Sequence, residues 1–390
     1  MLYLLIVFFD MRKNEGIGFV IATLMLLGLG CQEEVNTSNV ELLEFVEEYS
    51  LPLELEALPR ARSLQYNPKK NELSFFEQSQ TKLYVYDFAT RQLKHTFTFA
   101  KEGPNGTGNY NRLLGHHYIN PDSIYLFNNS TFALMAFSGE NRIKQEFRLN
   151  GYDNSQLVAF PDVRCLRPLV IVGGKAIIMG VSVGLNPVDN HTKLNQLRLI
   201  DLETGEITYT LPRSERYNQG YWGNVMLYQA YYDYNPDTEE LVCATGLDHE
   251  LFIYDLKTGK IRTVDARIEG FPNELKPLRK DKDERVSKEE AKRYEWTTPS
   301  YYCILYDTYR KRYYRFATPP LSDEEYLADE PLWPIVAVFD EHFDKVGEYT
   351  FPKDLPLKFN VMFVGPEGIY VNTPQLKEGF MSFYIFKPPV

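Results

Sequence analysis

The sequence predicts an all-β fold, a six-bladed β-propeller whose four-stranded antiparallel blades are closed into a ring by an N-terminal strand. The first observation is a repeated strand–turn–strand unit, clearest at residues 251–261 (Leu-Phe-Ile-Tyr-Asp-Leu-Lys-Thr-Gly-Lys-Ile). Similar units lie at 197–207 and 83–93, and weaker ones at 134–143 and 336–346. Apolar residues alternate before each turn, as half-buried strands require. Tandem copies of one such unit indicate a repeat architecture.

The turn of this unit has a simple chemistry. The Asp side chain accepts hydrogen bonds from backbone N–H groups that follow it, and a Gly closes the turn with a positive φ. Asp255 and Gly259 show this pattern. Where Gly is missing, we expect Asn141 and Asp344 to replace it, and Arg91 to fit worst. The Asp residues are therefore predicted to shape peripheral turns and not to catalyse a reaction.

The second observation is an earlier turn in each repeat, so that two hairpins form one four-stranded blade. Pro or Gly combined with Asn or Asp is typical of tight turns. These first turns lie at 67–71, 120–122, 173–174, 235–237, 307–308 and 365–367.

The third observation is that the sixth repeat runs out of chain before its outermost strand. The alternating stretch 51–56 is predicted to supply that strand, which would close the ring and remove its exposed edges. Seven blades, or two packed β-sandwiches, are the alternative architectures.

A charged insertion at 267–296 separates the fourth and fifth repeats. Ser287 and Ser322 each stand three residues before a Glu, which predicts two capped, short helices. An insertion of this kind either serves the functional face of a propeller or is a solvated excursion.

Composition excludes some functions. The 390 residues carry a formal net charge of −11, and no basic run is present. Nucleic acids and anionic membrane surfaces need a basic footprint, so neither is an expected partner of the folded domain. An aromatic content of 14% suits β-sheet and argues against disorder.

The N-terminus predicts export. We expect residues 1–30 to be a signal peptide, with the true start at Met11 ahead of a basic segment and an apolar run. The run ends at Cys31, which is predicted to be lipidated and to become the first residue of the mature chain. An uncleaved membrane anchor is the alternative. We expect a lipidated tether at 31–40, a single propeller at 41–390, and an outer-membrane lipoprotein of the bacterial envelope that is periplasmic or surface-exposed.

Three further cysteines, Cys165, Cys243 and Cys303, lie in apolar stretches without metal-ligand spacing. Buried free thiols are therefore expected in preference to a disulfide. No metal and no cofactor is expected.

The segment Glu102-Gly-Pro-Asn-Gly-Thr-Gly108, together with the Asp-Xaa-Xaa-Thr-Gly turns and the lipoprotein N-terminus, resembles an uncharacterised family of six-bladed propeller lipoproteins of the Bacteroidota type. This family has a domain of unknown function similar to TolB-like and NHL-like propellers. The resemblance implies a fold and a location, and no activity.

Residues on or near the first strand of each repeat are candidates to face the central channel. Two arginines beside aromatic rings could hold an anionic or sugar-like ligand, although such groups also line water-filled channels. The aromatic residues 217, 221 and 222 suit either sugar stacking or packing between blades. The candidate ligand-binding residues are Arg62, His116, Arg164, Arg167, Tyr228, Tyr301 and Asn360.

These observations favour recognition of a small molecule, a glycan or a protein at the channel mouth by a lipid-anchored envelope protein. An enzyme is not favoured because no serine-hydrolase or metalloprotease motif is present. A channel-centred, metal-dependent hydrolase or lyase is the first alternative. A scaffold in an envelope complex is the second.

Overall fold

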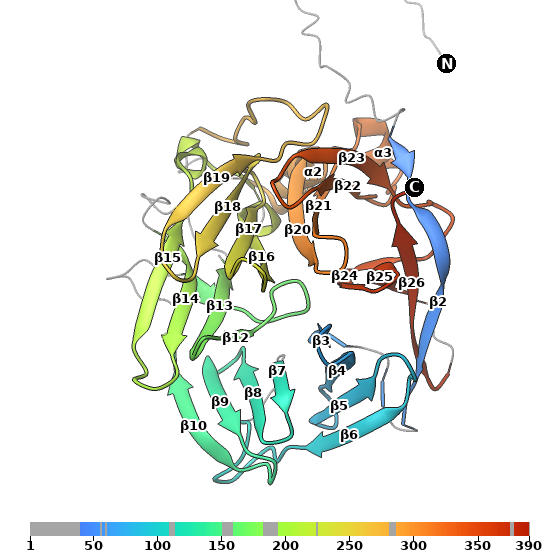
Figure 1. The fold of residues 1–390 in the computed structure, drawn as a ribbon. Coiled ribbons are helices and arrows are strands. Elements are labelled where there is room, and N and C mark those ends of the chain that lie inside the picture. The colour runs from blue at the N-terminus through green and yellow to red at the C-terminus, as the bar shows by residue number, and fades with distance from the viewer. Residues whose placement is uncertain are drawn as a thin grey trace, which may run out of the picture. The chain divides into compact units, whose positions relative to one another are not determined.

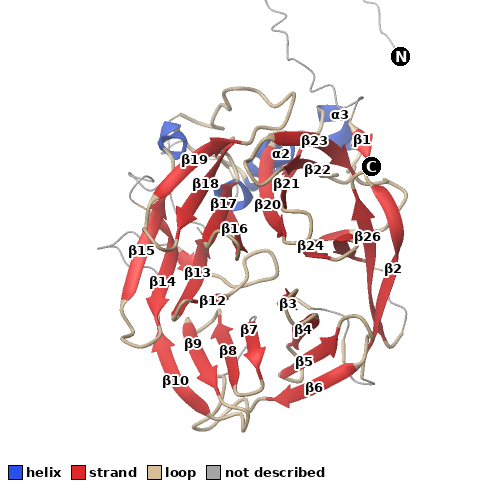
Figure 2. Cartoon of the chain, viewed as in Figure 1, coloured by secondary structure: helices blue, strands red, loops and turns tan. Residues whose placement is uncertain are grey.

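In the computed structural model the described residues are 40–54, 57–58, 61–108, 114–149, 159–181, 194–223, 225–280, 286–374 and 378–389. They belong to one compact unit, Thr37–Val390. Six small antiparallel sheets follow one another around a ring (Figure 1). Figure 2 shows how strongly strands dominate over helices. The predicted six-bladed propeller is confirmed.

The first three blades follow the chain in order, and in each blade the strands pair sequentially outward from the channel. Blade 1 contains β3 (Leu64–Asn67), β4 (Glu72–Glu77), β5 (Lys82–Asp87) and β6 (Leu93–Thr98). Blade 2 contains β7 (Leu114–Asn120), β8 (Ser123–Asn128), β9 (Ala133–Phe137) and β10 (Ile143–Arg148). Blade 3 contains β11 (Phe160–Pro161), β12 (Val170–Val172), β13 (Lys175–Val181), β14 (Asn195–Asp201) and β15 (Ile207–Pro212).

The other three blades carry the helices and the ring closure. Blade 4 contains β16 (Ala230–Asn235), β17 (Glu240–Thr245), β18 (Glu250–Asp255) and β19 (Ile261–Asp265), preceded by the 3-10 helices η3 (Glu215–Gln219) and η4 (Val225–Tyr228). Blade 5 contains β20 (Ser300–Asp307), β21 (Arg312–Thr318), β22 (Ile335–Phe339) and β23 (Lys345–Thr350). Its helices are α2 (Lys288–Trp296) and α3 (Asp323–Leu327). Blade 6 contains β24 (Lys358–Gly365), β25 (Gly368–Asn372) and β26 (Phe380–Lys387).

An N-terminal strand closes the ring, but it is not the predicted one. β2 (Glu44–Pro52) pairs antiparallel with β26, and its register places Leu51 opposite Met381. Of the expected strand 51–56, residues 51 and 52 belong to β2 and residues 53 and 54 do not, whereas residues 55 and 56 lie outside the described residues. Pro52 is the last residue of β2 and lies opposite Phe380, and the Leu53 N–H still donates to the Gly379 carbonyl at 2.8 Å. The short β1 (Glu41–Leu42) pairs in parallel with the outer strand β23 of blade 5.

The core lies between the blades. Six clusters of buried apolar side chains in the described part of the chain fill the six junctions between neighbouring blades. β4 shows how one strand serves two junctions, because successive side chains point to opposite faces. Leu73 and Phe75 pack toward blade 6, whereas Phe76 packs toward blade 2.

The predicted turn chemistry is present. The Asp255 carboxylate accepts hydrogen bonds from the backbone N–H groups of Lys257 and Thr258, at 2.8 and 2.9 Å. Asn141 takes a positive φ of 55°, as expected, and Arg91 does so at 60°. In blade 5 the expectation was wrong, because Phe343 and not Asp344 has the positive φ. Phe343 is buried and stacks on the Tyr313 ring at 4.5 Å, so packing compensates for the strained backbone.

The two capped helices are also confirmed. The Ser287 and Ser322 hydroxyls accept from the backbone N–H of Glu290 and Glu325, respectively. Within the residues that the structure describes, no helix is long and apolar enough to span a membrane.

Candidate functional site

A loop of blade 3, residues 162–169, lies at the centre of the ring, and we call it the plug loop. It connects β11 to β12, both of which pair with the same strand, β13. The plug loop thus replaces the middle of the innermost strand, and Figure 1 shows the green segment before β12 reaching inward. Reciprocal backbone hydrogen bonds between Arg164 and Arg167, at 2.9 and 3.1 Å, close its tight turn.

Other blades hold the plug loop in place. The backbone of Val163 exchanges two hydrogen bonds with the Asn129 side chain of blade 2, at 2.9 and 3.0 Å. The Cys165 N–H donates to the Arg62 carbonyl at 2.8 Å, and its thiol donates to the Met362 carbonyl of blade 6. These contacts with blades 1, 2 and 6 fix the plug loop in the ring, so it is an ordered part of the fold and not a surface loop.

A buried carboxylate organises the charges of the plug loop. Asp162 accepts from the Arg167 guanidinium at 2.6 and 3.0 Å, and from Arg164 Nε at 3.0 Å. Arg167 also donates to Gln229 at 3.0 Å and lies over the Tyr231 ring. The Arg167 side chain is 8% exposed, whereas that of Arg164 is 49% exposed. Arg167 therefore stabilises the buried part of the plug loop, whereas Arg164 presents a fixed positive charge to solvent.

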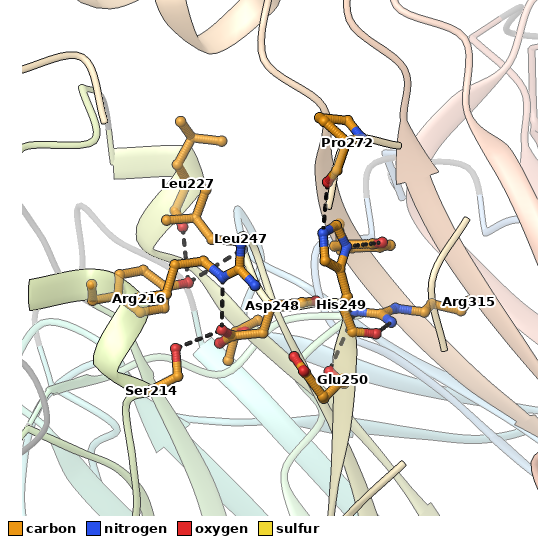
Figure 3. Close-up of polar contacts among 12 residues, drawn as sticks. Ser214, Arg216, Leu227, Leu247, Asp248, His249, Glu250, Pro272 and Arg315 are labelled. Atoms are coloured by element: carbon orange, nitrogen blue, oxygen red, sulfur yellow. Dashed lines mark hydrogen bonds and ion pairs between the residues drawn. The ribbon is translucent and has the colours of Figure 1, made fainter. Parts of the chain in front are cut away.

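A second buried carboxylate, Asp248, lies between β17 and β18 (Figure 3). It accepts hydrogen bonds from the hydroxyls of Ser214 and Thr245, both at 2.5 Å, and Arg216 lies 3.6 Å away. Burial raises the pKa of Asp248. Its hydrogen bonds hold the connection before η3 against blade 4.

Beside Asp248, His249 and Arg315 join blade 4 to blade 5 (Figure 3). His249 Nε2 lies 3.0 Å from the Pro272 carbonyl and must donate to it, so Nδ1 accepts from the Tyr301 hydroxyl at 2.8 Å. Burial lowers the pKa of His249, which favours this neutral form.

Arg315 is fully buried, and its guanidinium donates to backbone carbonyls that include those of Asp248 and His249. Its carbon Cζ lies 3.6 Å from the centre of the Tyr301 ring. The carbonyl dipoles and the ring face replace a counter-ion. All these groups bond within the fold, so the cluster in Figure 3 stabilises the blade 4–5 junction.

Three of the predicted ligand-binding residues are exposed. Arg164 belongs to the plug loop, and the Arg62 carbonyl accepts a hydrogen bond from Cys165 of the same loop. Asn360 lies on the inner strand β24, two residues before Met362, whose carbonyl accepts from the Cys165 thiol. The exposed residues of this group are Arg62, Arg164 and Asn360.

The remaining four candidates are buried. His116 does not face the channel mouth but bonds to Ser63 and Ser74 of blade 1, at 2.7 and 2.9 Å. Tyr228 lies in η4 and accepts from the Trp222 N–H at 2.9 Å. The buried residues are His116, Arg167, Tyr228 and Tyr301.

Trp222 and Tyr217 of the aromatic segment are fully buried, so these rings pack and do not offer a sugar-stacking surface. Across the described ranges no group of three or more His, Cys, Asp or Glu side chains is placed to hold a metal ion. Cys165, Cys243 and Cys303 are free and buried. Cys31 and the rest of the predicted leader lie outside the described residues.

The plug loop itself was not anticipated. Arg164 and Arg167 were expected on an inner strand, and the role of Asp162 as their shared partner has no sequence signature. The one available signal is the longer distance between second turns, from residue 138 to residue 201, in the third repeat. That distance shows extra residues but not where they go.

Comparison with known proteins places the chain among propellers. A family model described as a domain of unknown function, DUF4221, matches residues 45–350. A DUF4221 member from Bacteroides vulgatus has a TM-score of 0.68 at 21% identity, covering 90% of this chain and 98% of that one. A candidate exported protein from Bacteroides fragilis has a TM-score of 0.54 at 14% identity, with coverages of 87% and 95%. No curated protein matches.

Proposed function

Because this chain belongs to the DUF4221 family, a propeller family without an assigned function, we propose a role from the site alone. The protein is a lipid-anchored envelope protein that recognises a carboxylate-bearing ligand at the mouth beside the plug loop. A glycan, a small molecule or a segment of another protein could carry the carboxylate.

The orientation of Arg164 supports this proposal most strongly. Its Nε bonds to the buried Asp162, so the side chain is held in place although half of its surface is exposed. Among the described residues the Arg164 guanidinium bonds to Asp162 through Nε, which leaves its terminal NH₂ groups for a bidentate contact with a ligand carboxylate. Arg62, exposed on the neighbouring segment, adds a second positive charge.

A binding test uses a uronic-acid oligosaccharide and the same oligosaccharide after reduction of its carboxyl groups. We expect the acidic form to bind and the reduced form to bind at least tenfold more weakly by calorimetry, since a charged hydrogen-bonded pair contributes about 1.5–3 kcal/mol. The double variant Arg62→Ala/Arg164→Ala is expected to lose the same preference.

Arg142→Ala is the matched control, because Arg142 is an exposed arginine in the outer turn of blade 2. Equal binding of the acidic and reduced oligosaccharides, or an unchanged double variant, would refute the proposed site. Cleavage of the oligosaccharide during the titration would favour the hydrolase or lyase alternative.

The location rests on the sequence that precedes the propeller. An apolar run ends at Gly28-Leu-Gly-Cys31, and the Bacteroides fragilis protein of similar fold is a candidate for export. Acyl chains contribute roughly 0.8 kcal/mol per buried methylene, so lipid on Cys31 would anchor the chain durably.

Replacing Cys31 tests the anchor directly. In cells fed a labelled fatty acid, we expect the wild-type protein to carry the label and Cys31→Ala to lose it entirely. Cys243→Ala is the control, because Cys243 is buried in blade 4 and inaccessible to acyl transfer. Equal labelling of wild type and Cys31→Ala would rule out lipidation at this residue.

A further inference from the structure

We propose that α2 and α3 form a docking surface for a basic segment of a partner protein that carries an exposed apolar side chain. The two helices come from different connections, one between β19 and β20 and the other between β21 and β22. Both connections emerge at the same end of blades 4 and 5, because neighbouring strands are antiparallel. We call this pair of helices the platform.

The platform is braced internally. Arg293 forms an ion pair with Asp323 at 2.7 Å, and the Leu321 N–H donates to the Trp296 carbonyl at 2.9 Å. The Trp296 and Tyr326 rings meet edge to face at 6.2 Å. A five-residue helix such as α3 has no stability of its own, so these contacts and its capping box hold it in place.

The platform is attached to the propeller through α2. Tyr294 of α2 packs against the buried cluster that contains Tyr217 and Trp222, and its hydroxyl donates to the Lys276 carbonyl at 2.6 Å. Among the described residues, no side chain of α3 is buried or belongs to an apolar core cluster. Core packing therefore accounts for α2 but not for the fixed position of α3. The platform holds the exposed side chains of α3 and the residues after it in fixed positions toward solvent.

The exposed side chains define the partner. Leu327 is 83% exposed, more than any other large hydrophobic residue among those described, the next being Leu42 at 57%. The connection 319–334 contains five acidic residues and no Lys or Arg. Glu324, Asp329 and Glu330 are exposed within three residues of Leu327 along the chain. An exposed leucine flanked by carboxylates is complementary to an apolar side chain flanked by Lys or Arg.

The carboxylates beside Leu327 in the chain argue against a lipid surface as the occupant, because anionic headgroups would be repelled. They equally disfavour nucleic acid. A second copy of the chain, whose net charge is −11, has an overall charge that opposes docking. A basic protein segment is the occupant that satisfies both the apolar and the charged features.

The experiment measures binding of a labelled 14-residue peptide of Lys and Leu to the full chain by fluorescence anisotropy. We expect Leu327→Ala to weaken binding about tenfold, as loss of an apolar contact of this size implies. The triple variant Glu324→Gln/Asp329→Asn/Glu330→Gln should weaken binding at least as much and flatten its salt dependence. The thermal midpoint of both variants should stay unchanged, since these residues are exposed.

A second triple variant, Glu140→Gln/Glu203→Gln/Glu206→Gln, removes the same charge from exposed positions in blades 2 and 3. It should keep wild-type affinity. Equal losses in the two triple variants would overturn the inference by showing nonspecific attraction to an acidic protein. So would unchanged binding by Leu327→Ala, Leu327-dependent binding to vesicles of neutral and anionic phospholipid instead of the peptide, or Leu327-dependent dimerisation.

Discussion

Replacing Asp162 by Asn is expected to lower the free energy of unfolding by roughly 3–5 kcal/mol, the usual cost of removing one partner of a buried ion pair. Asp162 neutralises Arg167, whose side chain is 8% exposed and lies deep in the ring. An Asn at position 162 offers Arg167 at most a neutral amide oxygen, so with Gln229 and the Tyr231 ring the guanidinium stays buried without a counter-charge. The result is measured by chemical denaturation at pH 7.

The control is Glu146→Gln, which breaks the exposed ion pair between Arg148 and Glu146. Pairs of that kind contribute at most about 1 kcal/mol. A second variant, Asp162→Asn/Arg167→Met, removes both buried charges and should recover part of the loss. If Asp162→Asn were no more costly than Glu146→Gln, the plug loop would not depend on its buried ion pair.

The ring was predictable because its turns depend on local chemistry. The Asp255 side chain and Gly259 build the same turn wherever a similar segment occurs, so the repeat shows in the sequence. The sequence predicted that an N-terminal strand closes the ring but not its bounds, because residues 44–56 contain apolar residues on both sides of Pro52. Position along that stretch is decided by which side chains fit the blade 6–1 junction, and Tyr49 and Leu51 do so.

The candidate site was predictable in part for a different reason. Arg62 and Arg164 could be named as candidates from residue type, but their proximity depends on a loop that leaves its own blade and bonds to others. No local pattern specifies such a contact. His116 and Tyr301 were assigned to the channel because they follow the start of an inner strand. In the structure, hydrogen bonds to Ser63 and His249, respectively, hold the His116 and Tyr301 side chains in the junctions between blades.

Acid is expected to destabilise the junction between blades 1 and 2 through His116. Burial lowers the pKa of His116 from its ordinary value of 6.5 to about 3 in the folded protein. Between these two values the unfolded chain binds a proton that the folded chain does not, so the free energy of unfolding falls as pH falls. The contribution of His116 is complete above pH 6.5, and on the order of 2–3 kcal/mol of it is lost at pH 4.5.

Asp233 works in the opposite direction over part of this range. Burial raises its pKa from 3.8 to about 6, so its protonation favours the folded state as pH falls below 6. Burial also lowers the pKa of the neighbouring His117 to about 4, so the pH profile of the wild-type protein mixes all three groups. The difference between wild type and His116→Gln reports on His116 and its repulsion of His117, because both proteins keep His117 and Asp233.

Gln at position 116 can still hydrogen-bond to Ser63 and Ser74 but does not titrate, so His116→Gln should lose less stability than wild type between pH 7 and pH 4.5. His342→Gln is the control, because His342 is exposed in an outer turn of blade 5 and is solvated in both states. Urea denaturation at half-unit pH steps measures the profiles. Parallel profiles for wild type and His116→Gln would mean that His116 can accept a proton without leaving the junction, contrary to its enclosure by the two serines.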